Sequence, residues 1–407
     1  MHLMNASSEP ATVGQNPHLS RQILLLAAGA FSSALSTRIS DPILPQLSQV
    51  FGITIGEAAS VISAYALAYG FMLLVYGPVG DRYGKFRVIT IAAIASLVGA
   101  LGSALAISFQ WLTLFRFLNG ATACALIPLS MAWIGDNVPY ERRQHVLAYF
   151  MSGQILGLIS GQAVGGFLAD VAGWRSVFYF QVLTYLIVGT CLVIETRRSP
   201  GIDRKVENAS EGVSFSKQIV AVIGKPWPQQ VLLTVFVEGF FLFSALAFVP
   251  SFLHHQYGLS LTTAGLSMGM FGIGGLCYTL FARFFVTRFG ERGLALGGGG
   301  LISLAFLQII FCNGWHWVLP AMWCAGIGFY MLHNTLQTNA TQMAPAARGT
   351  AVALFASCFF TGQSLGVWLA SMSVDRFGFY AVFCAAALTL PIIGFFFSTR
   401  LREKQLG

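Results

Sequence analysis

The stretch GPVGDRYGKFR, residues 77–87, packs three glycines, a proline and four charged residues into eleven positions. It joins two long apolar runs, one ending near residue 79 and one beginning near residue 88. Glycine and proline favour turns, and charged side chains keep a connection in water. The stretch therefore predicts a short water-exposed loop between two long apolar helices.

The same alternation of apolar runs and polar connections covers nearly the whole chain. Of its 407 residues, 56% are hydrophobic and 9% are charged, whereas soluble domains carry about 25% charged residues. So few charges cannot cover a water-facing surface, so most of the surface must face lipid. Each run approaches the ~20 residues that cross a bilayer, and no room is left for a soluble domain. We predict an all-α membrane protein with twelve transmembrane helices, at 22–47, 57–79, 88–108, 112–135, 145–169, 176–195, 229–253, 262–285, 293–312, 317–342, 349–372 and 378–399.

The basic residues predict which side each connection faces. With twelve spans and the N-terminus inside, nineteen of the 23 lysines and arginines lie on the inner side. Only Arg175 and Arg376 lie outside, while Arg38 and Arg116 lie within spans. Positive charge collects on the cytoplasmic side of membrane proteins. We therefore expect both termini in the cytoplasm, and we attribute the net charge of +8 to topology, not to nucleic-acid binding.

An internal repeat divides the chain into two halves. Sliding one half over the other by 206 residues aligns features from the first helix past the fourth, without gaps. The aligned pairs are Phe51-Gly52 with Tyr257-Gly258, Arg82-Tyr83-Gly84 with Arg288-Phe289-Gly290, Gly120 with Gly326, Pro139 with Pro345 and Arg142 with Arg348. We predict a six-helix bundle at 1–195, a cytoplasmic linker at 196–228 and a second six-helix bundle at 229–407. Such repeats place a substrate site between the halves, near the bilayer midplane.

Two motifs carry a family resemblance. Residues 77–87 resemble the major facilitator superfamily signature G-x-x-x-D-R-x-G-R/K-x-R in its expected loop, and RFLNG at 116–120 resembles the signature R-x-x-Q-G, with Asn119 in place of the glutamine. The resemblance implies the major facilitator fold of two pseudo-symmetric bundles, in a multi-pass protein of the cell inner membrane. It also implies that Asp81 clasps the start of the eleventh helix and stabilises the outward-facing state. We assign the conformational gate to the loop residues and to one arginine of the repeat: Gly77, Asp81, Arg82, Gly84 and Arg142.

A stripe of glycines marks the fifth span. Gly153, Gly157, Gly161 and Gly165 recur every four residues, and small residues in register let two membrane helices approach closely. The pattern resembles the signature of drug:proton antiporters, which ends G-P-x-x-G-G. This chain has Gln162 where that signature has proline. We predict a helix-packing role for the four glycines.

Few ionisable residues lie deep in the apolar runs, and they fall on four spans. Arg38 and Asp41 lie on the first, Arg116 on the fourth, Glu238 on the seventh and His333 on the tenth. In the resembled superfamily these four helices line the central cavity. Ionisable residues inside a membrane are costly and are functional candidates by default. We expect either an Arg38–Asp41 pair, three residues apart on one helix face, or an Arg116–Asp41 bridge. Either arrangement would hold helices together or handle substrate and protons.

Two further candidates lie in the second half. Glu238 has the apolar Val235, Phe241 and Leu242 as helical neighbours, and removal from water favours a protonated carboxyl, as proton coupling requires. On the tenth span, polar side chains form one stripe that must face protein or a watery cavity, because lipid would leave its amides unsatisfied. Its members are His333, Asn334, Gln337, Thr338 and Thr341.

These observations predict a secondary transporter that exports a small amphipathic compound in exchange for protons. An alternative keeps the fold but takes up or exchanges an organic anion bound by Arg38 and Arg116. No nucleophile–base set, nucleotide motif or metal-ligand spacing is present in the sequence, so we expect no enzyme activity, no cofactor and no metal. The expected partners are a small-molecule substrate, protons and the lipid bilayer, and we expect a monomer.

Overall fold

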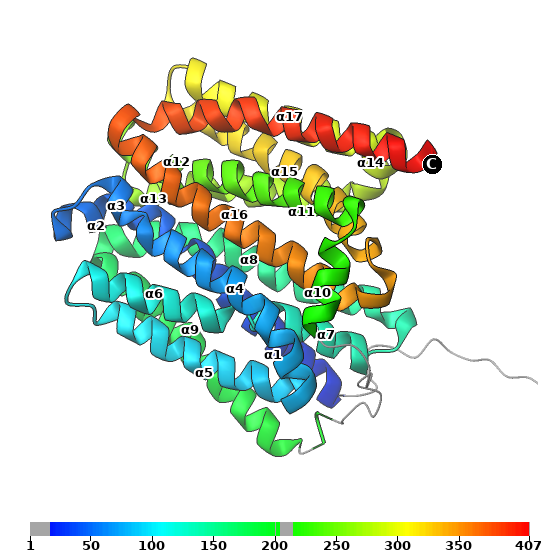
Figure 1. Ribbon diagram of the computed structural model, residues 1–407. Coiled ribbons are helices and arrows are strands. Elements are labelled where there is room, and N and C mark those ends of the chain that lie inside the picture. Colours follow the sequence, from blue (N-terminus) through cyan, green and yellow to red (C-terminus); the bar gives the residue numbers. More distant parts are fainter. Residues whose placement is uncertain (1–16, 200, 204–214, 407) are drawn as a thin grey trace, which may run out of the picture.

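The computed structural model describes residues 17–199, 201–203 and 215–406. The described chain is almost entirely helical, and its helices run roughly side by side along one direction (Figure 1). Helices of the first half lie in the lower part of the view and those of the second half in the upper part. The first half comprises α1 (Pro17–Arg38), η2 (Asp41–Ile43), α2 (Leu44–Phe51), α3 (Ile55–Ala58), α4 (Ser60–Tyr83), α5 (Lys85–Ala104), α6 (Phe109–Ala123), α7 (Leu126–Asn137), α8 (Tyr140–Ala172) and α9 (Trp174–Arg198).

The second half begins after the linker helix and repeats this arrangement. The linker helix is α10 (Phe215–Ile223), and the second half comprises α11 (Pro226–Glu238), η3 (Gly239–Phe243), α12 (Ser244–Tyr257), α13 (Leu261–Leu280), α14 (Ala282–Phe311), η4 (Trp315–Trp317), α15 (Val318–Gln342), η5 (Pro345–Ala347), α16 (Arg348–Phe377) and α17 (Phe379–Leu406). Gly52 and Gly258, 206 residues apart, both end their helices in the left-handed conformation, with φ of 64° and 65°. Only glycine adopts this conformation readily, so the repeat seen in the sequence is also a repeat of turns.

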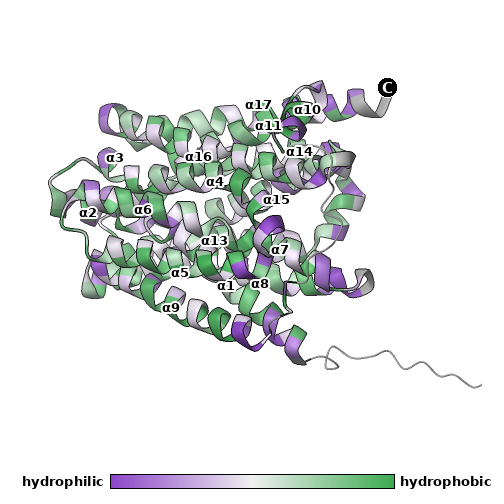
Figure 2. Cartoon of the chain, turned by 60° about the horizontal axis from the view of Figure 1, so that its bottom comes forward, coloured by the Kyte–Doolittle hydropathy of each residue, from purple (hydrophilic) through white to green (hydrophobic). Residues whose placement is uncertain are grey.

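The surface is suited to lipid. Among the described residues, ten helical segments are long and apolar enough to cross a membrane. Helices α13 and α15, of 20 and 25 residues, pack among them, and the break at Gly290 (φ 62°) divides α14 where the eighth predicted span gives way to the ninth. Hydrophobic residues fill the middle of the bundle and hydrophilic residues gather at its ends (Figure 2). Large apolar side chains such as Phe71, Leu280 and Phe395 are exposed, as a lipid-facing surface requires.

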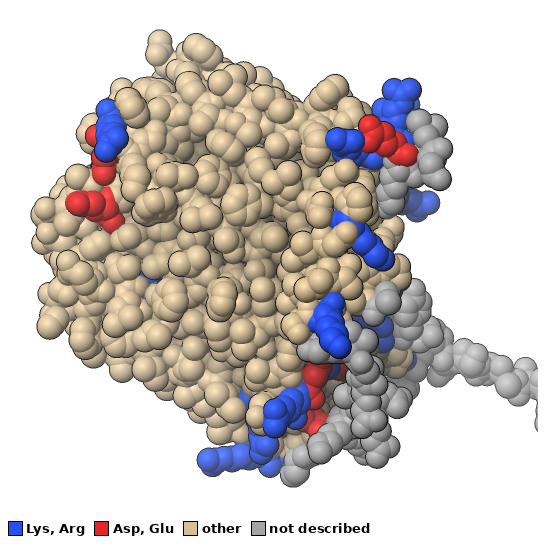
Figure 3. Space-filling model, viewed as in Figure 1, with Lys and Arg blue, Asp and Glu red and all other residues tan. Residues whose placement is uncertain are grey.

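The two ends of the bundle differ in charge. Most of the visible lysines and arginines gather at the end where the C-terminus lies (Figure 3). We call this the basic end, defined by the α4–α5 connection (Arg82, Lys85, Arg87) and the last turns of α17 (Arg400, Arg402). The opposite end, with the α5–α6 and α8–α9 connections, is the far end. Each span runs from one end to the other.

Two helix pairs carry most of the contact between the halves. Helix α4 packs along α16, and α8 packs along α13; Figure 1 shows α16 beside α4. Glycines make this approach possible. A Cβ atom on Gly70 of α4 would lie 3.1 Å from the carbonyl oxygen of Ser357 on α16. A Cβ atom on Gly265 of α13 would collide with the carbonyl oxygen of Gln162 on α8. The halves therefore meet backbone to backbone.

Candidate functional site

The first and seventh spans are interrupted where their ionisable residues lie. Helix α1 ends at Arg38 and gives way to the 3-10 turn η2, which begins with Asp41 and Pro42. Proline lacks the N–H that would continue the helix. Helix α11 ends at Glu238 and passes into the π-helix η3. Single π turns inside helices are frequently found at functional sites, and broken membrane helices often form the substrate site of transporters.

Glu238 and His333 form a buried pair between the seventh and tenth spans. Nδ1 of His333 lies 2.7 Å from Oε2 of Glu238. Glu238 is fully buried, and its second oxygen, Oε1, has no hydrogen-bond partner among the described residues. Whichever group is the donor, one proton is shared between the two atoms. The free oxygen leaves the pair able to bind a further proton or a hydrogen-bonding ligand.

Aromatic rings surround His333. Its ring centroid lies 4.7 Å from that of Phe329, 4.9 Å from Phe359 and 5.3 Å from Phe355. Aromatic faces attract cations within about 6 Å, so this cage offers both an apolar surface and a favourable surrounding for positive charge. Its members come from α15 and α16.

Arg38 and Asp41 form the first of the two predicted pairings. Arg38 Nη1 donates to Asp41 Oδ2 at 3.1 Å, and Gln162 Nε2 donates to the same oxygen at 3.2 Å. The Arg38 guanidinium carbon lies 4.2 Å from the centre of the Phe243 ring. Arg38 Nη2 and Asp41 Oδ1 are buried without partners among the described residues.

Phe243 connects this pair to the Glu238–His333 pair. It is the last residue of η3, and its ring centroid lies 5.3 Å from Phe329 and 5.0 Å from Phe359. A continuous set of ring contacts thus runs from Arg38 to His333. The structure brings four predicted residues of three spans into one interior cluster.

Arg116 has a different setting. Its Nη2 donates to the Ser36 carbonyl oxygen at 3.0 Å, and its guanidinium carbon lies 4.2 Å from the centre of the Tyr65 ring. Asn119 is held by the Ser96 carbonyl oxygen at 2.9 Å and by Gln181 at 3.0 Å. These contacts join α6 to the first, second, third and sixth spans, so Arg116 and Asn119 together fasten the first half. The alternative bridge from Arg116 to Asp41 is not among the contacts of the described residues.

The polar stripe of α15 becomes more exposed towards the basic end. His333, Asn334 and Gln337 are half-buried, whereas Thr338 and Thr341 are exposed. Thr338 donates to the Asn334 carbonyl oxygen of its own helix at 2.8 Å. The stripe leads from the basic end of the helix to the Glu238–His333 pair.

The predicted gate residues are open to solvent, but they do not form the predicted loop, because α4 continues to Tyr83 and α5 begins at Lys85, which leaves only Gly84 between the helices. The Asp81 side chain is 61% exposed and pairs with Lys85 at 3.0 Å, and Lys85 pairs with Asp136 at 2.7 Å. Within the described part of the chain, Asp81 makes no ion pair with the start of α16, so the expected clasp is not formed in this conformation. Arg142 is exposed at the start of α8, and no side chain lies near the position of a Gly77 Cβ.

Gly84 and Arg82 are the remaining predicted gate residues of this α4–α5 connection. Gly84 has φ 94° and lies against Asp203 of the linker, which accepts hydrogen bonds from the Phe86 and Arg87 backbone N–H groups, both at 2.9 Å. Arg82 lies over the ring of Tyr83. The linker thus caps α5, a contact with no signature in the sequence.

The glycine stripe of α8 faces α1. A Cβ atom on Gly153, Gly161 or Gly165 would lie 2.6–2.7 Å from the backbone carbonyl oxygen of Ala27, Leu35 or Ile39, respectively. A Cβ atom on Gly157 would collide with the carbonyl oxygen of Phe31. Each glycine meets the carbonyl oxygen one turn further along the first span. In the second half, Gly362 and Gly366 of α16 meet Phe236 and Phe240 in the same way. These contacts fix the helices that carry Arg38, Asp41 and Glu238.

Three residues that were not selected from the sequence belong near this cluster. Gln162 donates to Asp41, Phe243 links the two pairs, and Gln363 is buried on α16 with both side-chain amide atoms unpaired among the described residues. The backbone of Gln363 lies against Gly239, next to Glu238. For Gln162 and for Gln363, the one signal in the sequence was a polar glutamine within an apolar run.

Comparison with known proteins gives one consistent result. A sequence profile described as Major Facilitator Superfamily matches residues 26–367. The Uncharacterized MFS-type transporter YceJ of Bacillus subtilis (strain 168) is 26% identical over 379 residues, covering 91% of this chain and 94% of the relative. The multi-drug resistance efflux pump PmrA of Streptococcus pneumoniae is 24% identical over 407 residues, covering 93% and 96%.

A solved structure shows the same fold. A bacterial homologue of the human lysosomal transporter Spinster, in an inward-facing and unoccupied conformation, superposes with a TM-score of 0.76 at 18% identity. The match covers 95% of this chain and 98% of that one.

Proposed function

Because the chain belongs to the Major Facilitator Superfamily, we propose that this membrane transporter exports a small amphipathic organic compound, preferably cationic, in exchange for protons. The proposal includes alternating access, in which the two halves rock around the interior cluster. It places the protein in the cell inner membrane as a monomer, with the basic end and both termini in the cytoplasm.

The Glu238–His333 pair carries the proposal. A fully buried carboxylate with one unpartnered oxygen lies beside an imidazole and a cage of aromatic rings. A carboxylate in a low-dielectric site is stabilised by a nearby positive charge or by a proton. An organic cation and a proton therefore compete for Glu238, and competition for one group is the simplest physical basis for exchange.

The residues around Glu238 and His333 provide a binding surface for the substrate and a polar route for substrate and protons. The cage of Phe329, Phe355 and Phe359 accommodates the apolar body of the substrate by burial and cation–π attraction. The α15 stripe, with Asn334 and Gln337, gives protons and substrate a polar route from the basic end. Protonation of Glu238 removes the charge that holds a cation, which favours release when the site faces the other side.

Arg38 and Asp41 form a second titratable pair, coupled to the first through Phe243. A change in substrate or proton occupancy that moves Phe243 alters the setting of the Arg38 guanidinium, which lies over its ring. We assign Arg116 to holding the first half together, since its contacts are to Ser36, Asn119 and Tyr65 of that half.

We further propose that this conformation faces inward. The halves meet closely at the far end, and the fold resembles an inward-facing transporter. The contact between Asp81 and the start of α16, expected for the outward-facing state, is accordingly not formed among the described residues. Closure of the basic end would bring Asp81 towards the start of α16.

One observation favours the alternative substrate class. Arg38 Nη2 is buried without a partner among the described residues, and such a nitrogen would bind a carboxylate or phosphate. Uptake or exchange of an organic anion through Arg38, with Arg116 assisting, is therefore the second candidate. Arg116 already has several contacts, which leaves Arg38 as the main anion-binding group.

The two candidates are separated by binding followed by transport. Purified protein is screened for thermal stabilisation by organic cations such as ethidium and by aromatic anions such as benzoate, at two pH values. The strongest binder is then assayed in proteoliposomes with an imposed pH gradient and a clamped membrane potential. We expect cation accumulation in acidic vesicles that is lost in Glu238→Gln and retained in Glu57→Gln, an exposed acid at the far end. Stabilisation by anions alone, lost in Arg38→Gln, would instead support the second candidate.

A further inference from the structure

Two aspartates join the halves of the molecule at the far end. Asp375, near the end of α16, accepts hydrogen bonds from the Thr54 hydroxyl at 2.7 Å and from the Gly56 backbone N–H at 3.0 Å. These donors lie at the start of the second span, in the other half. One carboxylate thus fastens the eleventh span to the second.

The second aspartate makes the reciprocal contact. Asp170, near the end of α8, accepts from the Leu261 backbone N–H at 3.2 Å, from the Thr262 backbone N–H at 2.7 Å and from the Thr262 hydroxyl at 2.6 Å. Here a residue of the first half fastens the start of the eighth span. Both aspartates use a threonine hydroxyl and backbone N–H groups across the boundary between the halves.

The repeat relates the two contacts. A shift of 206 residues carries Asp170 to within one position of Asp375, and carries Ile55, beside Thr54 and Gly56, onto Leu261. A glycine lies at each contact and permits the close approach, because a Cβ on Gly56 would collide with Asp375 and one on Gly166 with the Leu261 carbonyl oxygen. Two matching contacts on a pseudo-twofold arrangement close the far end symmetrically.

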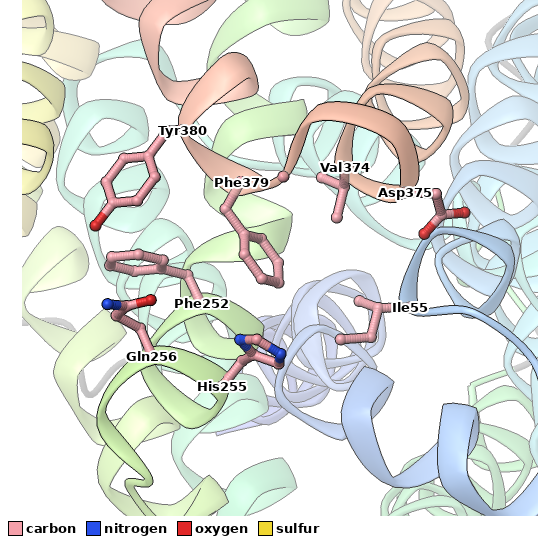
Figure 4. A pocket seen from close by; sticks show the side chains of 9 residues that line it. Ile55, Phe252, His255, Gln256, Val374, Asp375, Phe379 and Tyr380 are labelled. Carbon is pink, nitrogen blue, oxygen red and sulfur yellow. The ribbon is translucent and has the colours of Figure 1, made fainter.

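The Asp375 contact is exposed at the surface. A cavity of about 360 Å³ lies beside it, and its lining includes Ile55, Phe252, Asp375, Phe379 and Tyr380. Figure 4 shows Asp375 and Ile55 on one side of this cavity and the aromatic side chains on the other. Ile55 comes from the first half and the other lining residues from the second. Solvent beside a hydrogen-bonded carboxylate can replace its partners when they separate, so the contact can open and re-form.

We propose that Asp170 and Asp375 are the two latches of the far-end gate, which must release together when the transporter opens to that side. This inference rests on the proposed alternating access, but not on the substrate or on proton coupling. Hydrogen bonds to a charged group are stronger than those to neutral groups. The latches therefore bias the resting protein towards the far-end-closed state.

The test is a distance measurement between spin labels across the far end. Ile107 and Asn313 lie at exposed connections of opposite halves, and the repeat aligns them. They are labelled as cysteines in a background whose seven native cysteines are replaced. In the absence of substrate and gradient, Asp170→Asn and Asp375→Asn should each raise the population of longer distances, by about tenfold per latch. The double variant should shift it further.

Glu57→Gln is the matched control. Glu57 also accepts a backbone N–H at the far end, but from Thr54 of its own half, at 2.9 Å. It should leave the distance distribution unchanged. A double aspartate variant with the same distribution as its parent would overturn the proposal. Because no substrate is present, failure of the proton-exchange proposal would leave this result intact.

A second experiment replaces the Asp375 latch with a reversible covalent link. Thr54→Cys and Asp375→Cys are joined by a short thiosulfonate crosslinker that dithiothreitol releases, in the same cysteine-free background. Closure of this link should abolish transport of the compound identified by the stabilisation screen, and reduction should restore it. Transport at an unchanged rate through fully crosslinked protein would show that the contact need not open.

Discussion

The contact between α8 and α1 yields a sharp prediction for Gly161→Ala. A Cβ at this position would lie 2.6 Å from the Leu35 carbonyl oxygen, whereas ordinary contacts begin at 3.4 Å. The two helices must therefore separate by about 0.8 Å at this level, because neither backbone can rotate away. Gln162, the next residue, moves with α8.

Two costs follow from that separation. Overpacking a tight contact destabilises by about 1–3 kcal/mol, and a gap of this size along the stripe forfeits roughly a quarter to a half of each dispersion contact. The Gln162–Asp41 hydrogen bond, now 3.2 Å, would lengthen towards about 4 Å, outside hydrogen-bonding range. Its loss adds about 1–3 kcal/mol, since the acceptor is charged.

The assay is thermal unfolding of purified protein in detergent, at one fixed heating rate because membrane proteins commonly unfold irreversibly. We expect Gly161→Ala to lower the midpoint by several degrees. Gly300→Ala is the control, because no neighbouring atom lies within 4 Å of its Cβ position and alanine favours a helix. Equal midpoints for the two variants would refute the close-contact reasoning.

Three further predictions concern other parts of the fold and are checked by the same unfolding measurement. Arg38→Gln and Asp41→Asn should each lower the free energy of unfolding by about 3–5 kcal/mol, because each leaves the other buried charge without its partner. The double variant should lose less stability than the sum of the two single losses. Strictly additive losses would argue against the ion pair. Arg116→Lys should lose most of the stability lost in Arg116→Met, because lysine cannot reproduce the planar fork; full stability in the lysine variant would contradict the assigned contacts. Gly290→Ala should cost about 1–3 kcal/mol, because the φ of 62° and ψ of 174° at Gly290 are essentially restricted to glycine. Gly349→Ala is the control, because Gly349 has open space and no such φ. Equal effects of the two substitutions would contradict a strained turn.

The spans could be predicted from the sequence because their signal is local. The predicted fifth span at 145–169 lies within α8, Tyr140–Ala172, and the first at 22–47 lies within the stretch from α1 to α2. Pro42, directly after Asp41, accounts for the break in the first span, because it lacks the N–H that would continue the helix. The π-helix at 239–243 carries no such signal: it forms where Gly239 packs against the Phe359 carbonyl oxygen of α16, which only the folded chain brings there.

The site residues stood out singly, whereas their partners did not. Glu238 and His333 are each polar residues in an apolar run, but they are 95 positions apart, and the local neighbours of Glu238 suggested no partner. Gln162 stood out as a departure from an antiporter signature, and its bond to Asp41 could not be foreseen. The Asp81 clasp depends on which end of the molecule is closed, and a sequence does not specify a conformational state.

Proton release on ligand binding tests most directly whether substrate and proton compete for Glu238. Purified protein in weakly buffered detergent is mixed with ethidium, or with the strongest cationic binder from the screen, and the pH change is recorded. Competition for one carboxyl predicts release of about one proton per bound cation, absent in Glu238→Gln and present in Glu57→Gln. Equal release from Glu238→Gln and from the unmodified protein would contradict it, as would cation binding to the unmodified protein without any proton release.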